Sequence, residues 1–215
     1  MGISVCSQEQ KMQKCYIVGA GECFGLDFSK DEGDYIIAAD AGYRYLMEAG
    51  KVPDMVVGDF DTLKYLPEHP NVVQLPCEKD VTDTWEAVTR GLDKGYKEFH
   101  IYGCTGGRIE HTIANIQLLA RIAEEGGSGY LYDEKSILTV IKDSEIAFDE
   151  SFTGYISVFS LSEKSSGVTI EGLKYETVNV ELSNSFPLGV SNEFTGKASK
   201  ISVDEGCLLI VYPKK

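Results

Sequence analysis

The chain has 215 residues, with 20 lysines and arginines against 34 aspartates and glutamates, so its formal net charge is −14. A chain this acidic is poorly suited to bind nucleic acid or an anionic membrane surface, because both partners require a positive field. Hydrophobic residues make up 43% and charged residues 25% of the sequence, which is typical of a globular protein and argues against intrinsic disorder.

The first two thirds of the chain alternate short apolar runs with helical patterns. The apolar runs predict strands at 15–19, 35–39, 55–57, 99–102, 129–132 and 137–141. Apolar residues at helical spacing predict helices at 42–49, 84–94 and 109–123. Strands that alternate with helices predict an α/β fold with a doubly wound, mostly parallel sheet and helices on both of its faces.

The last third of the chain has a different pattern, in which apolar residues recur with period two. It predicts strands at 155–161, 175–180, 198–203 and 208–212, which are typical of an antiparallel β-sandwich. The segment 189–194 is rich in glycine, serine and asparagine, a composition that is typical of a β-turn. We therefore expect an α/β domain at 1–143 followed by a β-sandwich domain at 144–215.

The six cysteines form no C-x-x-C pair, and the three histidines add no spacing that is typical of a zinc site. An even number of cysteines could form three disulfides, but a chain of this length does not need them. Cys15 and Cys104 border apolar runs, where reduced thiols pack as small hydrophobic groups. The sequence shows no signal-peptide pattern and no apolar run long enough to span a membrane. We expect a cytoplasmic protein with no membrane partner.

Two aspartates follow the apolar run at 55–57, and they are the first candidate site residues. Asp59 and Asp61 are two positions apart, so in extended chain their carboxylates point to the same side of the strand. Open α/β sheets bind ligands at this edge, and carboxylate pairs together with substrate phosphates hold Mg²⁺. The alternative interpretation is an aspartate-rich turn after a strand, which is common.

Further acidic residues are expected near the same edge of the sheet. Asp40 follows the predicted strand at 35–39, and Asp80 and Asp83 precede the predicted helix at 84–94. Each of the latter two can instead be explained by helix capping, because acidic residues stabilise the first turn of a helix. Their common placement at strand ends and helix starts favours a ligand site.

A glycine-rich turn between the predicted strand at 99–102 and the helix at 109–123 is the third candidate. Backbone N–H groups at Gly106 and Gly107 and the guanidinium of Arg108 suit phosphate oxygens. His111 and Asn115 share one face of the helix. The segment lacks the P-loop pattern G-x-x-x-x-G-K-S/T, and a simple turn with a solvated arginine is the alternative. The loop at 19–25 has its third glycine one residue late for a dinucleotide fingerprint, so it is equally compatible with a turn.

The order of these motifs resembles that of thiamine pyrophosphokinases over nearly the whole chain. The segments that carry the resemblance are A-A-D-A-G, V-G-D-F-D-T, K-D-V-T-D-T, G-G-R-I-E-H-T-I-A-N-I, V-S-N-E-F and the terminal G-C-L-L-I-V-Y-P. The resemblance implies an ATP-binding α/β domain and a thiamine-binding β-sandwich, in a homodimer whose active site lies at the interface. It also implies Mg²⁺-dependent transfer of a pyrophosphoryl group from ATP to the hydroxyl of thiamine, which gives thiamine diphosphate and AMP.

The resemblance assigns roles to residues at matching positions. The metal ligands that it implies are Asp40, Asp59, Asp61, Asp83 and Glu110. The catalytic residues that it implies are Asp59, Asp61, Asp83 and Arg108. The ATP-binding residues that it implies are Gly106, Gly107, Arg108, His111 and Asn115. The thiamine-binding residues that it implies are Asp80, Ser191 and Asn192, the last two offered across the dimer interface.

Three positions depart from the family pattern. Glu110 replaces the usual aspartate, which keeps the charge and shifts its position by one methylene. Thr62 replaces a common serine and keeps the hydroxyl, whereas Val190 replaces a common threonine and loses it. The sequence does not decide whether Asp59 or Asp83 accepts the proton of the attacking hydroxyl.

Two alternative functions remain compatible with these residues. One is a diphosphokinase for another alcohol, such as a pterin. The other is a non-catalytic module that binds ATP or thiamine. The set of Asp59, Asp61, Asp80 and Asp83 favours an enzyme, because a simple binding protein gains little from several converging carboxylates.

Overall fold

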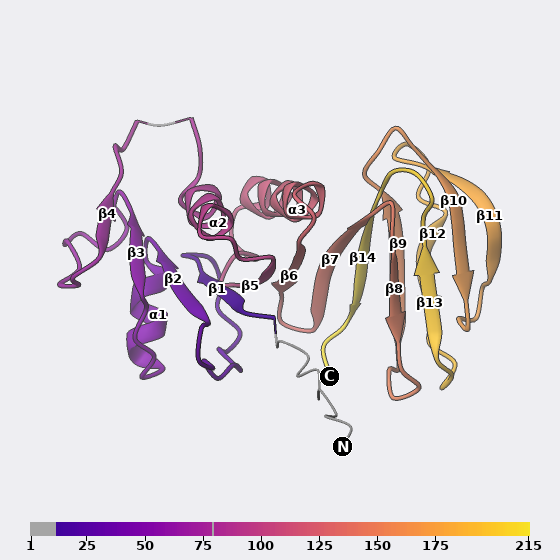
Figure 1. The fold of residues 1–215 in the computed structure, drawn as a ribbon, viewed down its shortest axis with the longest axis horizontal. Helices are drawn as coiled ribbons and strands as arrows, with labels where there is room; N and C mark the ends of the chain where they lie inside the picture. The colour runs from indigo at the N-terminus through magenta and orange to yellow at the C-terminus, as the bar shows by residue number, and fades with distance from the viewer. Residues whose placement is uncertain (1–11, 79) are drawn as a thin grey trace, which may run out of the picture.

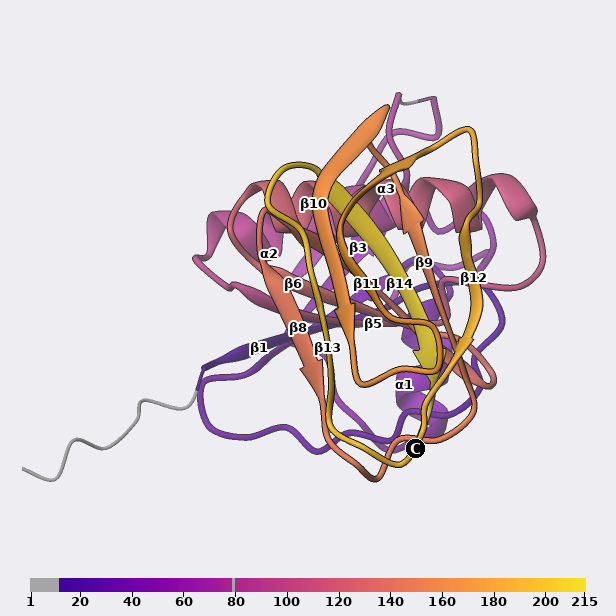
Figure 2. The ribbon, with the colours of Figure 1, turned by 90° about the vertical axis from the view of Figure 1, so that its right-hand side faces the viewer.

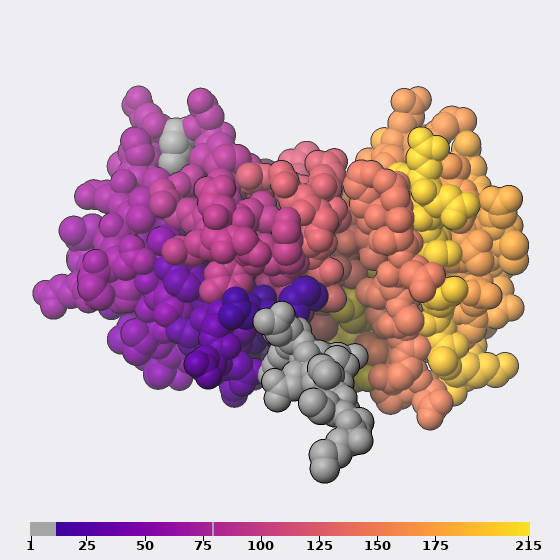
Figure 3. All heavy atoms as spheres, viewed as in Figure 1, coloured from indigo at the N-terminus to yellow at the C-terminus, as the bar shows by residue number. Residues whose placement is uncertain are grey.

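The computed structural model describes residues 12–78 and 80–215. Figure 1 shows an α/β part and an antiparallel β part side by side, and Figure 3 shows them as two lobes. In the described residues the strands form one sheet of ten and one sheet of four. Their orders are β12-β9-β14-β7-β6-β5-β1-β2-β3-β4 and β11-β10-β13-β8.

The α/β part is built on the parallel strands of the large sheet, and all neighbours from β6 to β4 pair in parallel. These strands are β1 (Lys14–Val18), β2 (Tyr35–Ala39), β3 (Met55–Gly58), β4 (Val72–Gln74), β5 (Glu98–Tyr102) and β6 (Ser128–Tyr132). Helix α1 (Gly42–Glu48) lies on one face, while α2 (Asp83–Asp93) and α3 (Ile109–Glu124) lie on the other (Figure 1).

Each face of the parallel strands buries its own set of side chains, which explains why these strands read as continuous apolar runs. Ile17, Ile37 and Ile101 pack against α2 and α3, whereas the alternate residues Val18 and Ile36 face α1. The predicted doubly wound arrangement is therefore confirmed. Bounds agree with the predicted ranges to within one or two residues at most ends.

The large sheet continues into the antiparallel part without a break. Strand β7 (Ser136–Lys142) pairs antiparallel with β6 and with the last strand, β14. The small sheet packs against this antiparallel half through a shared apolar core, and Figure 2, which looks onto the small sheet, shows its strands in front of those of the large sheet. The predicted sandwich is therefore confirmed. The remaining strands are β8 (Glu145–Phe148), β9 (Tyr155–Ser160), β10 (Lys164–Glu171), β11 (Thr177–Ser183), β12 (Gly189–Glu193), β13 (Ser199–Ser202) and β14 (Cys207–Pro213).

Four strands have no counterpart among the predicted ones, namely β4, β8, β10 and β12. Strands β4 and β8 are short, and β10 contains a register shift next to Gly167, whose φ is +67°. The prediction of a turn at 189–194 is wrong, because residues Gly189–Glu193 form the edge strand β12, which has a register shift between Gly189 and Asn192. Such irregularities interrupt the period-two pattern on which strand prediction depends.

The cysteines in the described ranges are free thiols, namely Cys15, Cys23, Cys77, Cys104 and Cys207, while Cys6 lies outside those ranges. Burial raises the pKa of the Cys15 and Cys104 thiols, so both stay protonated at neutral pH. In the described part of the chain, no helix is both long and apolar enough to cross a membrane.

Candidate active site

A cleft of about 610 Å³ opens at the carboxyl-terminal edge of the parallel strands. Its walls come from the loops after β1, β2, β3 and β5 and from the first residues of α2 and α3. Strand β1 lies between β2 and β5. From β1 the chain proceeds through β2 and β3 to β4 on one side, and it then crosses back to add β5 and β6 on the other side. This is the switch point at which open α/β sheets bind ligands.

Three of the predicted metal ligands come together in this cleft. Each of Asp40, Asp59 and Asp61 offers a carboxylate oxygen, and these oxygens lie within 4.8 Å of one another. Asp40 is 5% exposed, and its buried Oδ1 has no hydrogen-bond partner. A buried carboxylate oxygen without a donor is unfavourable unless a cation or proton is supplied.

The two aspartates after β3 converge for a reason that differs from the predicted one. The residue between them, Phe60, has a φ of +62° and is therefore left-handed rather than extended. Its side chain is buried in the core beneath the loop, while the N–H of Asp61 donates to Asp59 Oδ1 at 3.3 Å. The tight turn, held by a buried ring, brings the carboxylates together.

Asp40 is held in place by backbone contacts with the neighbouring strand. Its φ is +48°, and its N–H donates to the carbonyl of Val57 at 2.8 Å. A Cβ atom on Gly58 would lie 3.0 Å from the Cα of Asp40. Glycine at position 58 therefore allows the backbones after β2 and β3 to approach closely enough to join their carboxylates.

The predicted acidic residues before α2 separate in the structure. Asp83 is the first residue of the helix and lines the cleft, whereas Asp80 is exposed and is not among the lining residues. The helix is capped by Thr82, whose Oγ1 accepts a hydrogen bond from the N–H of Trp85 at 3.1 Å. Thr82 therefore serves as the N-cap of the helix, so the cap does not require Asp83, which lines the cleft.

The glycine-rich turn after β5 forms the wall opposite the aspartates. Gly106 and Gly107 have φ values of +71° and +56°, and both line the cleft with Arg108 and His111. A guanidinium nitrogen of Arg108 contacts Nε2 of His111. Within the cleft wall, the buried Asn115 donates from Nδ2 to the carbonyl of Cys104 at 2.7 Å, which ties α3 to the turn.

Glu110 lies outside the cleft lining. Its carboxylate is exposed, and Oε1 is 3.5 Å from Nε of Arg108. An ion pair this exposed contributes little to stability, and it places Glu110 beside Arg108 rather than beside the aspartates.

Several residues of this wall were not predicted. The hydroxyl of Thr105 donates to Asp133 Oδ1 at 2.7 Å, and the hydroxyl of Thr84 lies 3.7 Å from the sulfur of Cys104. Burial raises the pKa of the Cys104 thiol to about 12, so it does not act as a nucleophile. Asp133 is 28 residues from Thr105, and no sequence pattern indicates that pairing.

The charge of the cleft is unbalanced. Among the described residues that line it, four are carboxylates and Arg108 is the only lysine or arginine. Hard oxygen ligands of this kind suit Mg²⁺ better than softer metals. The unpartnered oxygen of Asp40 and the close oxygens of its neighbours therefore fit a divalent cation.

Comparison with known proteins assigns this arrangement to a family. A model of the catalytic domain of thiamin pyrophosphokinase matches residues 29–130, and a model of its vitamin B1 binding domain matches residues 143–208. The chain belongs to the thiamin pyrophosphokinase family. The expected enzyme class, thiamine diphosphokinase, is confirmed.

Individual members of the family are similar over most of their length. The chain is 30% identical over 189 residues to the thiamine pyrophosphokinase of Bacillus subtilis, which covers 84% of this chain and 88% of the relative. A crystal structure of the B. subtilis enzyme superposes with a TM-score of 0.85 at 28% identity, covering 94% and 100% of the two chains. The Geobacillus thermodenitrificans enzyme gives 0.80 at 28% identity, covering 94% and 98%.

The residues expected on the thiamine side lie at the opposite end of the large sheet. Ser191 and Asn192 are on β12, and neither is among the residues that line the cleft. Ser191 is exposed with a φ of +58°, and its N–H donates to Ser157 Oγ at 3.0 Å. Asn192 is buried and exchanges hydrogen bonds of 3.0 and 2.7 Å with the backbone of Tyr175. Within one chain, these residues are separate from the cleft.

Proposed function

We propose that the cleft binds ATP together with Mg²⁺ and transfers the pyrophosphoryl group to the hydroxyl of thiamine. The observation that carries this proposal is the cluster of Asp40, Asp59 and Asp61, with one buried oxygen unpartnered, opposite a glycine turn that ends in Arg108. A triphosphate brings negative charge into a cleft that already contains an excess of carboxylates. Binding therefore requires a cation, and the acidic cluster is placed to hold it.

The metal site in this proposal consists of Asp40, Asp59 and Asp61, with Asp83 beside them. Bound Mg²⁺ would supply charge neutralisation at the phosphate oxygens. Asp80 and Glu110 are exposed and lie outside the lining. We assign Glu110 to orienting Arg108, through their 3.5 Å contact, rather than to the metal. Asp80 would reach thiamine only from the rim of the cleft.

The remaining residues bind, orient and move a proton. The N–H groups of Gly106 and Gly107 and the guanidinium of Arg108 face the phosphates, while His111 and Asn115 fix the arginine and the turn. The hydroxyl oxygen of thiamine forms a bond to the β-phosphorus, the bond to the bridging oxygen breaks, and AMP leaves with that oxygen. The hydroxyl proton passes to a cleft carboxylate, either Asp59 or Asp83. Such transfers depend mainly on positioning and charge.

The reaction is tested by incubating the purified protein with ATP, Mg²⁺ and thiamine and measuring AMP and thiamine diphosphate by chromatography. We expect both products in equal amounts, and neither without thiamine. AMP formed only when a hydroxymethyl pterin replaces thiamine would favour the alternative alcohol. Binding of ATP and thiamine with no AMP from either alcohol would favour the non-catalytic module.

The active site is proposed to be completed by a second copy of the chain. Ser191 lies far along the sheet from the cleft, and apolar side chains are exposed in both places. Ile109 and Ile113 are 69% and 53% exposed beside the cleft, and Leu188 is 59% exposed near β12. Exposed apolar residues of this kind are available for an interface, and a two-fold dimer would bring each region onto the other.

A mixing experiment tests whether the site is shared. Asp61→Ala disables the metal side, and Ser191→Arg places bulk and positive charge on the thiamine side. If the site spans two chains, an equimolar mixture refolded together regains about a quarter of wild-type activity, because half of the dimers then hold one intact site. No recovery, or a monomer in sedimentation analysis, would contradict the shared site.

The domain division and the cellular location also stand as proposals. The family models match 29–130 and 143–208, which supports a functional division near residue 143 although the large sheet is continuous there. The free thiols of the described residues support a cytoplasmic location, where glutathione keeps thiols reduced. Fractionation of cells with an antibody against the protein tests the location.

A further inference from the structure

The glycine turn that faces the phosphates in the proposed function is already in contact with a carboxylate of the same chain. Glu22, in the loop after β1, accepts a hydrogen bond through Oε1 from the N–H of Gly107 at 3.3 Å. The two residues are 85 positions apart in sequence. Glu22 is exposed, so its carboxylate remains at the turn although water is available to solvate it.

The position of the Glu22 backbone is fixed by the neighbouring loop. Its N–H donates to the carbonyl of Thr105 at 3.0 Å, and the N–H of Gly21 donates to that of Gly103 at 2.7 Å. The hydroxyl of Tyr45 donates to the carbonyl of Gly21 at 3.0 Å. The backbone of residues 21–22 is therefore held by the segment 103–105 and by Tyr45, so a movement of Glu22 away from the turn involves its side chain.

The turn has room for this side chain because position 106 is a glycine. A Cβ atom on Gly106 would lie 2.7 Å from both Cγ and Cδ of Glu22. Any larger residue would displace the carboxylate from the turn. The absence of a side chain at Gly106 thus serves the contact with Glu22 as well as the left-handed backbone of the turn.

We propose that Glu22 competes with the phosphates of ATP for the N–H of Gly107, and so weakens binding of the nucleotide. A carboxylate and a phosphate oxygen are both anionic acceptors and cannot share one N–H donor at full strength. The carboxylate also adds to the negative charge around a cleft whose only lining lysine or arginine, among the described residues, is Arg108. Nucleotide binding then requires the side chain of Glu22 to swing away. This inference rests on the proposed function, because it takes the turn as the phosphate site.

The test compares nucleotide affinities of Glu22 variants by calorimetry in the presence of Mg²⁺. Glu22→Gln removes the charge with almost no change of shape, and Glu22→Asp keeps the charge but shortens its reach. We expect Glu22→Gln to lower the dissociation constant for ATP about three- to tenfold, the range for one competing hydrogen bond. We expect a smaller decrease for Glu22→Asp, and no change for adenosine, which has no phosphate. The KM for ATP should fall together with the dissociation constant for ATP. The change in kcat should be smaller than the change in KM.

Two controls separate the possible results. Glu163→Gln removes the same charge from an exposed turn of the antiparallel part, and it should leave ATP affinity unchanged. If the wild-type protein binds ATP but Glu22→Gln binds it equally or more weakly, the competition is wrong and Glu22 instead braces the turn. If neither protein binds ATP, the assignment of the turn to phosphate is wrong, and the proposed function fails with it.

Discussion

One strand of the parallel sheet, β2, is flanked by two buried aspartates with opposite surroundings. Asp34, which precedes the strand, is 6% exposed, and Asp40, which follows it, is 5% exposed. Asp34 accepts hydrogen bonds from the backbone N–H groups of Lys14 and Asp31 at 2.8 and 3.0 Å. Asp40 keeps a buried oxygen with no partner. The two carboxylates are therefore almost equally buried, but that of Asp34 has hydrogen-bond donors for both of its oxygens, whereas that of Asp40 has one buried oxygen without a donor.

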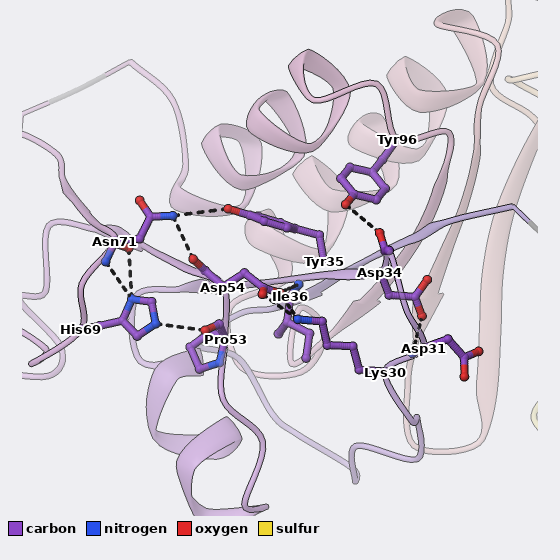
Figure 4. Close-up of polar contacts among 11 residues, drawn as sticks. Lys30, Asp31, Asp34, Tyr35, Ile36, Pro53, Asp54, His69, Asn71 and Tyr96 are labelled. Atoms are coloured by element: carbon purple, nitrogen blue, oxygen red, sulfur yellow. Dashed lines mark hydrogen bonds and ion pairs between the residues drawn. The ribbon is translucent and has the colours of Figure 1, made fainter.

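Figure 4 shows a second aspartate at the amino-terminal edge of the sheet whose carboxylate is satisfied in a similar way. Asp54, which precedes β3, accepts from the N–H of Ile36 at 2.7 Å and pairs with Lys30. The first residues of parallel strands offer free N–H groups, which carboxylates accept, whereas the last residues offer carbonyl oxygens, which repel carboxylates. Asp34 and Asp54 at the amino-terminal edge consequently stabilise the fold through these donors, whereas Asp40 at the carboxyl-terminal edge has a buried oxygen without one.

We expect the largest effect from Asp40→Asn. The substitution keeps the shape and removes the charge that we assign to the metal, so we expect kcat to fall by about a hundredfold or more. Without Mg²⁺ the unfolding free energy should be unchanged or higher, because repulsion from Asp59 and Asp61 is relieved. With Mg²⁺ the wild type should gain stability by ligand binding and the variant much less. Steady-state kinetics and thermal unfolding with and without Mg²⁺ measure both effects.

The opposite outcome would overturn the interpretation of Asp40. If Asp40→Asn lost stability in metal-free buffer and kept its turnover, Asp40 would be a structural residue like Asp34. If Asp40→Asn behaves as expected, Asp61→Ala should lose the stabilisation by Mg²⁺ to a similar degree. That result would extend the metal-binding role from Asp40 to the other aspartates of the cluster.

The reciprocal substitution at the other end of β2 is Asp34→Ala. It leaves the N–H of Lys14, at the start of β1, without its acceptor, and we expect the unfolding free energy to fall by about 1–3 kcal/mol. Turnover at 25 °C should stay within about twofold of wild type, because the cleft is at the far end of the strand. Denaturant titration and an initial-rate assay provide the two numbers. A large loss of activity in a folded Asp34→Ala protein would show that the two edges are coupled.

A smaller effect is expected from changing the spacing between β2 and β3 at the carboxyl-terminal edge of the sheet. Gly58→Ala would place a methyl group 3.0 Å from Cα of Asp40, so the backbones after β2 and β3 must separate by a few tenths of an ångström. We expect a higher Mg²⁺ concentration for half-maximal activity, by about tenfold, because metal sites are sensitive to ligand geometry. A kcat measured at saturating Mg²⁺ should recover in part. An unchanged Mg²⁺ dependence would mean that Asp40 does not ligate the metal.

The aspartates that line the cleft could be singled out from the sequence because their signals are local. Apolar runs that end in aspartate indicated Asp40, Asp59 and Asp61, and a predicted helix start indicated Asp83. The topology of an open α/β sheet then brings these strand ends and helix starts to one edge, and all four residues line the cleft. The sequence could not predict that Phe60 is left-handed, because that conformation depends on the core that buries its ring. The contact between Glu22 and Gly107 depends on two loops far apart in sequence, and an exposed glutamate alone carries no signal.

The antiparallel half was harder to predict, for a related reason. The register of β7 with β14 joins residues about seventy positions apart, and period-two patterns do not indicate which strands pair. Strand β12 has the composition of a turn, and its pairing with β9 contains a register shift. Its identity as a strand depends on the neighbouring β9, and not on its own residues.

We expect the smallest change from a substitution at His100, a titratable residue in the middle of β5 that does not line the cleft. Its Nε2 and Nδ1 lie 2.8 Å from Glu98 Oε1 and from the hydroxyl of Tyr132, so the neutral ring donates to the glutamate and accepts from the tyrosine. Burial lowers the pKa of His100, and Glu98 offsets this only in part. The unfolded chain, with a pKa near 6.5, therefore binds more protons, and the contribution of His100 to stability is complete above that pH and is lost as the pH falls below it.

The variant His100→Gln isolates this contribution, because glutamine does not titrate but can still donate to Glu98 or accept from Tyr132. We expect the wild type to be more stable at pH 7.5 and the difference in melting temperature between the two proteins to shrink between pH 6.5 and 5. Turnover at pH 7.5 should be the same in both, because His100 does not line the cleft. A difference in melting temperature that stays constant over this range would show that the ring does not titrate within it. A changed turnover would instead show that a residue outside the cleft affects the reaction, and would contradict the separation between the residues that stabilise the sheet and those that line the cleft.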